Sequence, residues 1–515
     1  MTEILKPAEN FSPFKNWRYD VPAAVVVLLV ALPLCLGIAL ASGAPLFSGL
    51  IAGAVGGIVV GALSKSPLSV SGPAAGLTVI VLDAIQSLPS YEMFLAAVVL
   101  AGVIQLVLGA LRAGVIGDFI PSSVITGMLS AIGLILIIKQ IPYLVGFDAS
   151  NLSGDDGHHK GGNTVMHLWE AVQNPTKGAL IIGLVSLGFL FLWDMMQPKF
   201  KNFLRYIPGP LLAVAMGVAA NEIFKIHYTD LALGKDFLVA VPVSESLRDF
   251  TSHFTFPDFS VIYDYKVWII AATLAIVASL ETLLSIEAID RIDPFKRVTP
   301  TNHELLAQGT GNMISGLLGG IPVTSVIVRS SANMSSGART KMSTILHGLL
   351  LLGCVIAIPQ LLNHIPLATL AAVLIAVGYK LAKPKIFYAK YKKGMRHLIP
   401  FLATIIAILM TDLLIGIGIG CVFGLAFVLF QNMKSALTVV NDGNNYLIRS
   451  KRDLFFMHKY ELKRTLSSIP TDGKVLLDLS RAQFIDLDNV EIIQDFMTRA
   501  VYDNINVTVK GAVDE

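Results

Sequence analysis

Hydrophobic residues lie in long blocks along most of the chain, separated by short polar loops. The first block runs from Val21 to Ala41 without a charged residue. Because a helix needs about 20 mostly apolar residues to cross a bilayer, this block predicts a membrane span. Further predicted spans, some of them shorter, lie near 46–63, 73–87, 93–111, 121–138, 178–193, 209–224, 267–280, 305–318, 323–335, 341–361, 367–379, 398–411 and 413–430. The pattern predicts a mainly α-helical polytopic membrane protein with roughly fourteen spans.

The hydrophobic pattern changes after residue 432. Residues 440–515 are charged, and their short apolar stretches alternate as in a small soluble α/β domain. Predicted strands lie at 446–448, 453–457, 474–479 and 506–509, and predicted helices at 459–466 and 489–501. The strand at 474–479 is apolar on both faces, which predicts burial on both sides of the sheet. We therefore predict a polar tail over 1–20, a transmembrane domain over 21–432 and a soluble domain over 440–515.

The composition agrees with a chain that lies largely in lipid. Hydrophobic residues make up 54% and charged residues 15% of the 515 positions, whereas a soluble domain carries about 25% charged residues. So little charge cannot cover the surface of a soluble protein of this length, and the apolar excess must face the bilayer. The formal net charge of +3 is small, and we expect no nucleic acid among the partners.

Basic and acidic residues gather in different loops. The segment 380–397 holds seven Lys and Arg residues and no acid, whereas the segments 147–177 and 226–265 are rich in acids. Cytoplasmic loops collect Lys and Arg. With the N-terminus in the cytoplasm and an even number of spans, the basic loops fall on the cytoplasmic side and the acidic loops outside. We therefore predict that both termini are cytoplasmic, and we expect an integral protein of the bacterial inner (plasma) membrane.

Two short segments open with Gly and Pro at corresponding places in the two halves of the membrane domain. They are Ser71-Gly72-Pro73-Ala74-Ala75-Gly76 and Gly319-Gly320-Ile321-Pro322-Val323-Thr324-Ser325. A half-helix that begins inside the membrane leaves its first N–H groups unpaired, and these donors can hold an anion together with the positive end of the helix dipole. Paired interrupted segments of this kind point to the binding site of a transporter. The alternative is a pair of ordinary Gly/Pro kinks in packed helices.

Charged residues inside the spans are the main candidates for chemistry. Glu281 ends an apolar run, and Ser285 follows one turn later on the same helical face. An ionisable residue inside a span is costly and therefore a functional candidate, and a carboxylate with a nearby hydroxyl makes half of a small cation site. Glu281 can instead bind a proton or be a buried structural acid. Arg329 either raises the positive field around an anion or is anchored by Glu281 or another acid, and for Asp83 the sequence favours no role.

No catalytic or metal-binding motif is readable in the sequence. The three cysteines have no metal-ligand spacing, and the segment Asp155–Gly162, with its two adjacent histidines, is interpreted as a solvated loop. The sequence contains no nucleotide-binding loop, nucleophile elbow or zinc-protease motif. We therefore predict no catalytic residue, no metal site, no cofactor and no enzyme activity, and transport would draw on an ion gradient or on the gradient of the substrate itself.

These features together resemble the sulfate permease (SulP) family of anion transporters. The first span looks like the family's opening signature, through Val30-Ala31-Leu32-Pro33-Leu34 and Ala41-Ser42-Gly43-Ala44-Pro45. The two Gly/Pro segments look like the third and tenth spans of the family, accompanied by Gln308-Gly309-Thr310-Gly311-Asn312 and Gly337-Ala338-Arg339-Thr340-Lys341. The soluble domain is similar to a short STAS domain, through Val475-Leu476-Leu477-Asp478-Leu479-Ser480 and Phe484-Ile485-Asp486.

The resemblance implies two inverted repeats of seven spans, with a core domain that carries the substrate and a gate domain that holds a homodimer. It implies that the anion lies between the third and tenth spans, held by backbone N–H groups because the side chains there are mostly apolar. It further implies a coupling-ion site, for sodium or a proton, at Glu281 and Ser285. The predicted anion contacts are Ala74, Ala75, Ser325, Val326 and Ile327, with Arg329 beside them.

Two positions depart from the pattern of the family. Leu34 stands where some proton-coupled members carry a carboxylate, and Glu281 stands where bicarbonate carriers are expected to have Asp. Sodium and proton coupling therefore both stay open, as do sulfate and bicarbonate as substrates. We predict a secondary transporter of small inorganic anions that works by alternating access. The alternatives are a nucleobase carrier of similar fold and a membrane sensor or scaffold that acts through the STAS-like domain.

Overall fold

A computed structural model describes residues 15–115, 121–147, 173, 175–197, 207–244, 246–411, 413–432 and 435–511. The contacts within the chain divide it into two compact units, Met1–Cys421 and Val422–Glu515, and the division falls inside helix α20. The loop Asp155–Gly162 and most of the predicted N-terminal tail lie outside the described residues. The three domain boundaries predicted from the sequence stay predictions.

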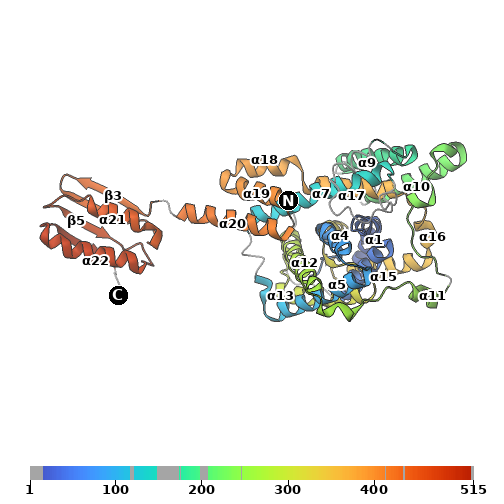
Figure 1. The fold of residues 1–515 in the computed structure, drawn as a ribbon, viewed down its shortest axis with the longest axis horizontal. Helices are drawn as coiled ribbons and strands as arrows, with labels where there is room; N and C mark the ends of the chain where they lie inside the picture. Colours follow the sequence, from blue (N-terminus) through green and yellow to red (C-terminus); the bar gives the residue numbers. More distant parts are fainter. Residues whose placement is uncertain are drawn as a thin grey trace. The chain divides into compact units, whose positions relative to one another are not determined.

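Eight helices in the described part are long and apolar enough to cross a membrane. They are α1 (Trp17–Ala41), the run α2–η2–α3 (Leu46–Leu63), α5 (Tyr91–Ala110), α7 (Ser122–Val145), α9 (Lys177–Met196), α10 (Gly209–His227), α12 (Tyr265–Ile292) and the run of α17 (Leu367–Leu381) and α18 (Pro384–Lys392). Shorter apolar helices are η3–α4 (Ala75–Ser87), α15 (Met342–Ala357), α19 (Met395–Met410) and α20 (Leu413–Asn432). With α13 (Thr301–Leu317) and the unit of β2 (Val323–Ser325) and α14 (Ile327–Ser335), these elements confirm the predicted mainly helical membrane protein (Figure 1).

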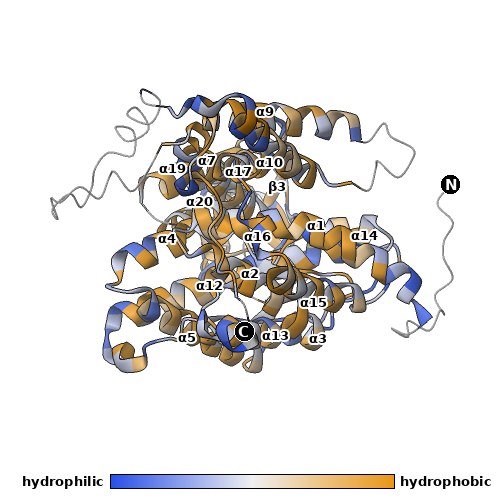
Figure 2. Cartoon of the chain, turned by 90° about the vertical axis from the view of Figure 1, so that its right-hand side faces the viewer, coloured by the Kyte–Doolittle hydropathy of each residue, from blue (hydrophilic) through white to orange (hydrophobic). Residues whose placement is uncertain are grey.

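The membrane helices form two packed groups (Figure 2). Helices α7, α9, α10, α17 and α19 pack on one another and are called the gate group, whereas α1, α2, α4, α5, α12, α13, α14 and α15 pack together as the core group. In Figure 2 the gate group lies above and most of the core group below, with α1 and α4 between them. The two groups correspond to the gate and core domains that the family resemblance implies.

Pairs of glycines allow helix backbones to approach closely within each group. In the core group, a Cβ atom on Gly102 of α5 would lie 2.6 Å from the carbonyl oxygen of Gly309 on α13, and a Cβ on Gly309 would lie 2.8 Å from that of Gly102. In the gate group, Gly133 of α7 and Gly378 of α17 face each other in the same way, at 2.5 and 2.7 Å. Small residues at such crossings are typical of membrane helix packing, because close contact replaces the hydrophobic effect as the driving force.

The third and tenth segments are interrupted by short strands that pair with each other. Strand β1 (Ser71–Pro73) runs antiparallel to β2 (Val323–Ser325), with Ser71 opposite Ser325 and Pro73 opposite Val323. Each strand leads directly into a helix, β1 into η3–α4 and β2 into α14 (Ile327–Ser335). Two half-helices therefore begin on either side of this small ladder, inside the core group, as the Gly/Pro segments predict.

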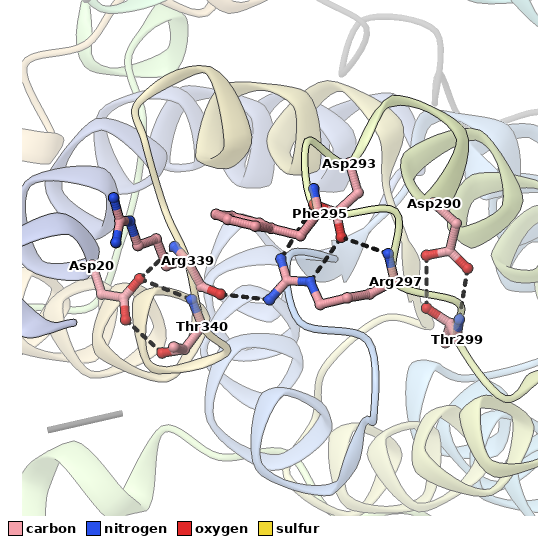
Figure 3. A network of polar contacts seen from close by, with 8 residues as sticks. All are labelled: Asp20, Asp290, Asp293, Phe295, Arg297, Thr299, Arg339 and Thr340. Carbon is pink, nitrogen blue, oxygen red and sulfur yellow. Dashed lines mark hydrogen bonds and ion pairs between the residues drawn. The ribbon is translucent and has the colours of Figure 1, made fainter. Parts of the chain in front are cut away.

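Polar contacts tie three parts of the core group together at one end of the helices (Figure 3). The carboxylate of Asp20, at the start of α1, accepts the N–H groups of Arg339 (2.8 Å) and Thr340 (3.0 Å). Arg297 donates to Asp293 (2.8 Å) and to the carbonyl of Arg339 (2.7 Å). The network joins α1 to the loops that precede α13 and α15.

The start of α7 in the gate group lies at the same end, and so does the basic helix α18. The N–H of Gly114, shortly before α7, donates to the side chain of Asn302 at the start of α13 (2.8 Å). Lys390 of α18 donates to the carbonyl of Ser122 at the start of α7 (3.2 Å). The starts of α1, α7 and α13 therefore share one end, called the basic end below, with the basic residues Arg291, Lys296, Arg297, Arg339 and Lys341 and the helix α18.

The second unit contains a four-stranded sheet with two helices, as predicted for a small mixed α/β domain. The strands β3 (Leu437–Asp442), β4 (Asn445–Ser450), β5 (Lys474–Asp478) and β6 (Asn506–Lys510) lie side by side in this order. β3 and β4 are antiparallel, and the other neighbours are parallel. Helices α21 (Lys459–Ser467) and α22 (Leu487–Tyr502) bury a core that includes Ile448, Leu477 and Ile493. The arrangement is compatible with a STAS domain.

Two details of the predicted sheet are wrong. Residues 453–457 form no strand, because only Leu454 bridges to Ile485 and a turn follows at Phe456–His458. The first strand of the hairpin is instead β3, which begins three residues before the predicted start of the domain at 440. Leu476 of β5 is 39% exposed, so the sheet is covered on one face only and β5 is not buried on both sides.

Candidate functional site

The N–H groups at the start of α14 divide into bonded and free ones. The N–H of Ser325 donates to the hydroxyl of Thr282 (3.3 Å), and that of Val326 donates to the carbonyl of Val70 (3.0 Å). The N–H of Ile327 has no acceptor among the described residues, and no side chain caps this helix. Of the three contacts predicted here, Ile327 thus keeps a free donor, whereas the other two use theirs to hold the strand.

The first half-helix begins in a similar way. Ala74 is buried and ends the extended segment, and Ala75 is partly buried. In the described part of the chain, the N–H of Ala75 has no acceptor. The next N–H, that of Gly76, donates to the carboxylate of Glu281. One free donor therefore remains at the start of each half-helix, and Val328 adds a further one on α14.

Glu281 lies against the start of the first half-helix. A Cβ atom on Gly76 would lie 2.6 Å from both carboxylate oxygens, so only glycine admits the carboxylate at this distance. Oε2 of Glu281 is buried and has no hydrogen-bond partner among the described residues. Ser285 is buried one turn further along α12. The carboxylate therefore has one oxygen available for a proton or a cation, and the hydroxyl of Ser285 follows on the same helical face.

Helix α12 contacts the starts of both half-helices through adjacent residues. Glu281 accepts the N–H of Gly76, and Thr282, which is fully buried, accepts that of Ser325. Because the two contacts are one residue apart on α12, a movement of this helix acts on both half-helices. Thr282 was not predicted from the sequence, because a hydroxyl residue is common in membrane helices, although its place beside Glu281 was a usable signal.

Arg329 is fully buried without an acidic partner. Its Nη2 donates to the carbonyl of Pro73 (3.3 Å), while Nε and Nη1 have no hydrogen-bond partner among the described residues. A Cβ on Gly72 would clash with Nη1, so a larger residue at position 72 would displace the guanidinium from this place. Within the described part, no ion pair joins Arg329 to Glu281 or to another acid. The predicted anchoring of Arg329 by an acid is therefore not found among the described residues, and its role in a positive field around an anion stays a prediction.

A polar network from α13 holds the two strands in position. The amide of Asn312 donates to the carbonyl of Val323 (3.0 Å) and accepts the N–H of the same residue (2.6 Å). Gln308 donates to the hydroxyl of Ser71 on β1 (2.7 Å). A second amide, that of Gln105 on α5, accepts from Asn312 (2.7 Å). These residues hold β1 and β2 in position. Of them, Gln308 and Asn312 were recognised in the sequence only as part of a family motif.

A cavity of about 880 Å³ leads to the start of the first half-helix. It lies between α4 and α12 on one side and α7, α19 and α20 on the other. Gly76 is at its inner end, and the wall runs toward the ends of α4 and α7 and the start of α12. Since α7 starts at the basic end, this cavity extends toward the opposite end. The lining residues are Gly76, Val79, Ile80, Asp83, Ala84, Ser87, Ile132, Ile135, Ile138, Lys139, Ile269, Ile270, Thr273, Ile408, Leu409, Thr411, Leu413, Leu414 and Ile415.

The path toward the basic end is closed in this conformation. Leu280 and Leu284 of α12 meet Val124 and Met128 of α7 there, and they leave a space of only about 10 Å³. All of these side chains are apolar. The start of the first half-helix is therefore approached from one end of the membrane domain, and packed apolar side chains lie toward the other end.

Comparison with known proteins identifies the family of the chain. The model of the sulfate permease family matches residues 17–418. The chain is 25% identical to the putative sulfate transporter YvdB of Bacillus subtilis, over 96% of this chain and 92% of that protein. It is 28% identical to the bicarbonate transporter BicA of Picosynechococcus, over 79% of this chain and 69% of that protein.

The fold is also similar to solved membrane transporters. The transmembrane domain of a cyanobacterial BicA matches with a TM-score of 0.65 at 23% identity, over 80% of this chain and 98% of that one. Murine Slc26a9 in the inward-facing state matches with a TM-score of 0.76 at 17% identity, over 96% and 87%. The family model and the transporter relatives confirm the prediction of a membrane transporter and not an enzyme. The chain belongs to the sulfate permease family.

Proposed function

We propose that this protein is a secondary transporter of a small inorganic anion, sulfate or bicarbonate, that binds near the starts of the two half-helices. The observation that carries the proposal is Arg329, a fully buried positive charge without an acidic partner among the described residues. A buried unpaired charge is costly, so a counter-charge is needed. An anion supplies it, and the relatives are named as transporters of sulfate and of bicarbonate.

The backbone donors give the anion its direct contacts. The free N–H groups of Ala75, Ile327 and Val328 lie at the positive ends of the half-helices, where donors and dipole both favour negative charge. Ser325 and Val326, whose N–H groups are already bonded, serve to position the second half-helix. The side chains of Ile327 and Val328 offer no hydrogen bonds, which favours a compact inorganic anion over a nucleobase.

Glu281 and Ser285 are the proposed site of the coupling ion. The free Oε2 of Glu281 takes either a proton or a sodium ion, and the hydroxyl of Ser285 is a second oxygen ligand. An ionised Glu281 beside Gly76 repels an anion at the neighbouring half-helix. Binding of the cation removes this repulsion, so the cation and the anion favour each other's binding.

The one-sided cavity supports alternating access as the mode of transport. With cytoplasmic loops rich in Lys and Arg, the basic end faces the cytoplasm and the cavity opens to the outside. Both termini are then cytoplasmic. To release the anion inside, the core group must shift against the gate group so that Leu280 and Leu284 separate from Val124 and Met128. The homodimer expected from the family remains a prediction.

Uptake into proteoliposomes tests this function. We expect labelled sulfate or bicarbonate to accumulate when an inward sodium or proton gradient is imposed, and uracil to remain outside. Protein-free liposomes and the Arg329→Gln variant, which lacks the buried charge, are the controls. Uptake of uracil would favour the nucleobase carrier, and the absence of any anion uptake or exchange would favour a sensor acting through the STAS-like domain.

A further inference from the structure

Among the described residues of its wall, the cavity that leads to Gly76 carries two opposite charges. Of the described residues that line it, only Asp83 and Lys139 are charged, and most of the others are Ile or Leu. Nζ of Lys139 lies 3.6 Å from Oδ1 of Asp83. Neither residue has a part in the proposed anion or cation site.

The two charges lie on different helix groups, and both lie further along the cavity than the start of the first half-helix. Asp83 follows Gly76 by seven residues on the same face of the first half-helix, which places it about 10 Å further along the cavity. Lys139 belongs to α7 of the gate group. The side chain of Lys139 is 29% exposed and that of Asp83 is 61% exposed, so water screens the carboxylate more than the ammonium.

We propose that Asp83 and Lys139 set the electrostatic potential of this cavity and thereby determine how readily a charged solute reaches the start of the half-helices. Lys139 attracts an anion into the mostly apolar passage, where the loss of hydration would otherwise make the entry of the anion unfavourable. Asp83 balances this attraction, so that the anion is not held at the mouth and passes on to Gly76. The inference rests on the proposed function only for the movement of the anion toward Gly76, because the two charges set the potential of the cavity whichever solute enters it.

The physical argument predicts opposite effects for the two residues. Removal of Lys139 leaves a negative charge in the passage, and removal of Asp83 leaves a positive one. A unit charge within about 10 Å, in surroundings between protein and water, changes the local concentration of an ion by about threefold to tenfold. A pair that acted only as a structural link between core and gate would instead give effects of the same sign in both variants.

A reporter thiol in the cavity measures the potential without any transport. Cys35, Cys354 and Cys421, the three cysteines of the chain, are replaced by Ala, and Ile80→Cys is introduced on the wall between Gly76 and Asp83. The rates of modification by an anionic and by a cationic methanethiosulfonate reagent are then compared. We expect Asp83→Asn to raise the ratio of anionic to cationic rates and Lys139→Gln to lower it, each by about fivefold or more. High ionic strength should reduce both shifts.

The controls separate charge from structure. Ser87→Ala alters an uncharged lining residue and should leave the ratio unchanged, and the double variant Asp83→Asn/Lys139→Gln should return it toward that of the parent. An unchanged ratio in both single variants, shifts of the same sign, or a reporter thiol that reacts with neither reagent would each overturn the proposal.

Transport kinetics of the same variants test the link to function separately. With the natural cysteines present, we expect the KM for the transported anion to rise about threefold in Lys139→Gln and to fall in Asp83→Asn at low ionic strength. If the reagent ratios shift as expected while KM stays constant, the potential is confirmed and the cavity is not the anion path, which contradicts the proposed function alone.

Discussion

At the scale of single residues, the membrane domain contains two buried charges with incomplete sets of partners. Glu281 accepts the N–H of Gly76 but leaves Oε2 unpaired, and Arg329 donates to the carbonyl of Pro73 and has no acidic partner among the described residues. Since an unpaired charge at this depth is unfavourable, each group requires a mobile partner of opposite sign. A cation at Glu281 and an anion near Arg329 would satisfy both, and this requirement is the physical basis of the coupled transport that we propose.

Substitution of Glu281 by Gln tests the cation site. The amide cannot take up a proton and has no charge for a sodium ion, so uptake driven by a cation gradient should fall to the rate without a gradient. The measurement is anion uptake into proteoliposomes with and without each gradient. Glu287→Gln, which alters an exposed acid paired with Arg291 (2.5 Å) on the same helix, should keep the stimulation. Full cation dependence in Glu281→Gln would exclude this role.

Gly76→Ala tests the close approach of the carboxylate to the half-helix. The added Cβ would lie 2.6 Å from both carboxylate oxygens, so Glu281 must move and lose the N–H bond. We expect the maximal uptake rate to fall by about tenfold, which corresponds to the loss of a hydrogen bond to a charged group. Gly188→Ala, where nothing lies within 4 Å, is the matched control. Normal uptake in Gly76→Ala would show that this contact is dispensable.

The sequence reveals some site residues better than others. Glu281 and Arg329 are conspicuous because a charge inside an apolar span is rare. Thr282 has no such signal, and the free and bonded N–H groups around Val326 depend on a contact with Val70, more than two hundred residues away in the chain. Backbone donors carry no side-chain signature, so their state could not be predicted residue by residue.

At the scale of elements, the close contact of α5 and α13 fixes the position of α13, and the polar side chains of α13 support the two strands. Gly309→Ala would place a Cβ 2.8 Å from the carbonyl oxygen of Gly102 and push the helices apart. We expect the variant to lose about 1–3 kcal/mol of stability, as for overpacking elsewhere, and to unfold at a lower temperature in detergent. Gly353→Ala on α15, with nothing within 4 Å, should unfold like the parent. Equal melting temperatures would contradict the assigned contact.

Elements with strong local signals are predictable, and those set by distant contacts are not. The half-helices are recognisable because Gly and Pro interrupt apolar segments of the chain. The pairing of β1 with β2 is not, because each strand has three residues and its partner lies far along the sequence. In the second unit, Leu476 is part of an apolar run, and only the placement of α21 and α22 on one face leaves it exposed.

At the scale of the whole molecule, the membrane domain and the C-terminal unit are separable in their contacts. The sheet of the second unit has its own hydrophobic core, which includes Ile448, Leu477 and Phe496. The anion and cation sites proposed above lie entirely in the first unit. We therefore predict that the C-terminal unit has no direct part in binding the anion.

Removal of residues 435–515 tests this division. We expect the truncated protein to accumulate to a lower level in the membrane but to transport with an unchanged KM per folded molecule. Uptake is normalised to the amount of monodisperse protein recovered in detergent. A complete loss of transport in well-folded truncated protein would assign the C-terminal unit a direct role in the transport cycle.

The central claim places the anion between the starts of the two half-helices, and protection of thiols by the substrate tests it most directly. Single cysteines are introduced by Ala75→Cys, Ile327→Cys and, as a control in the outer part of the cavity, Ile415→Cys, in a chain without its three natural cysteines. Each is modified with and without sulfate or bicarbonate. The account predicts that the transported anion slows modification at positions 75 and 327 and leaves position 415 unaffected. Equal rates with and without either anion at both half-helices would contradict it.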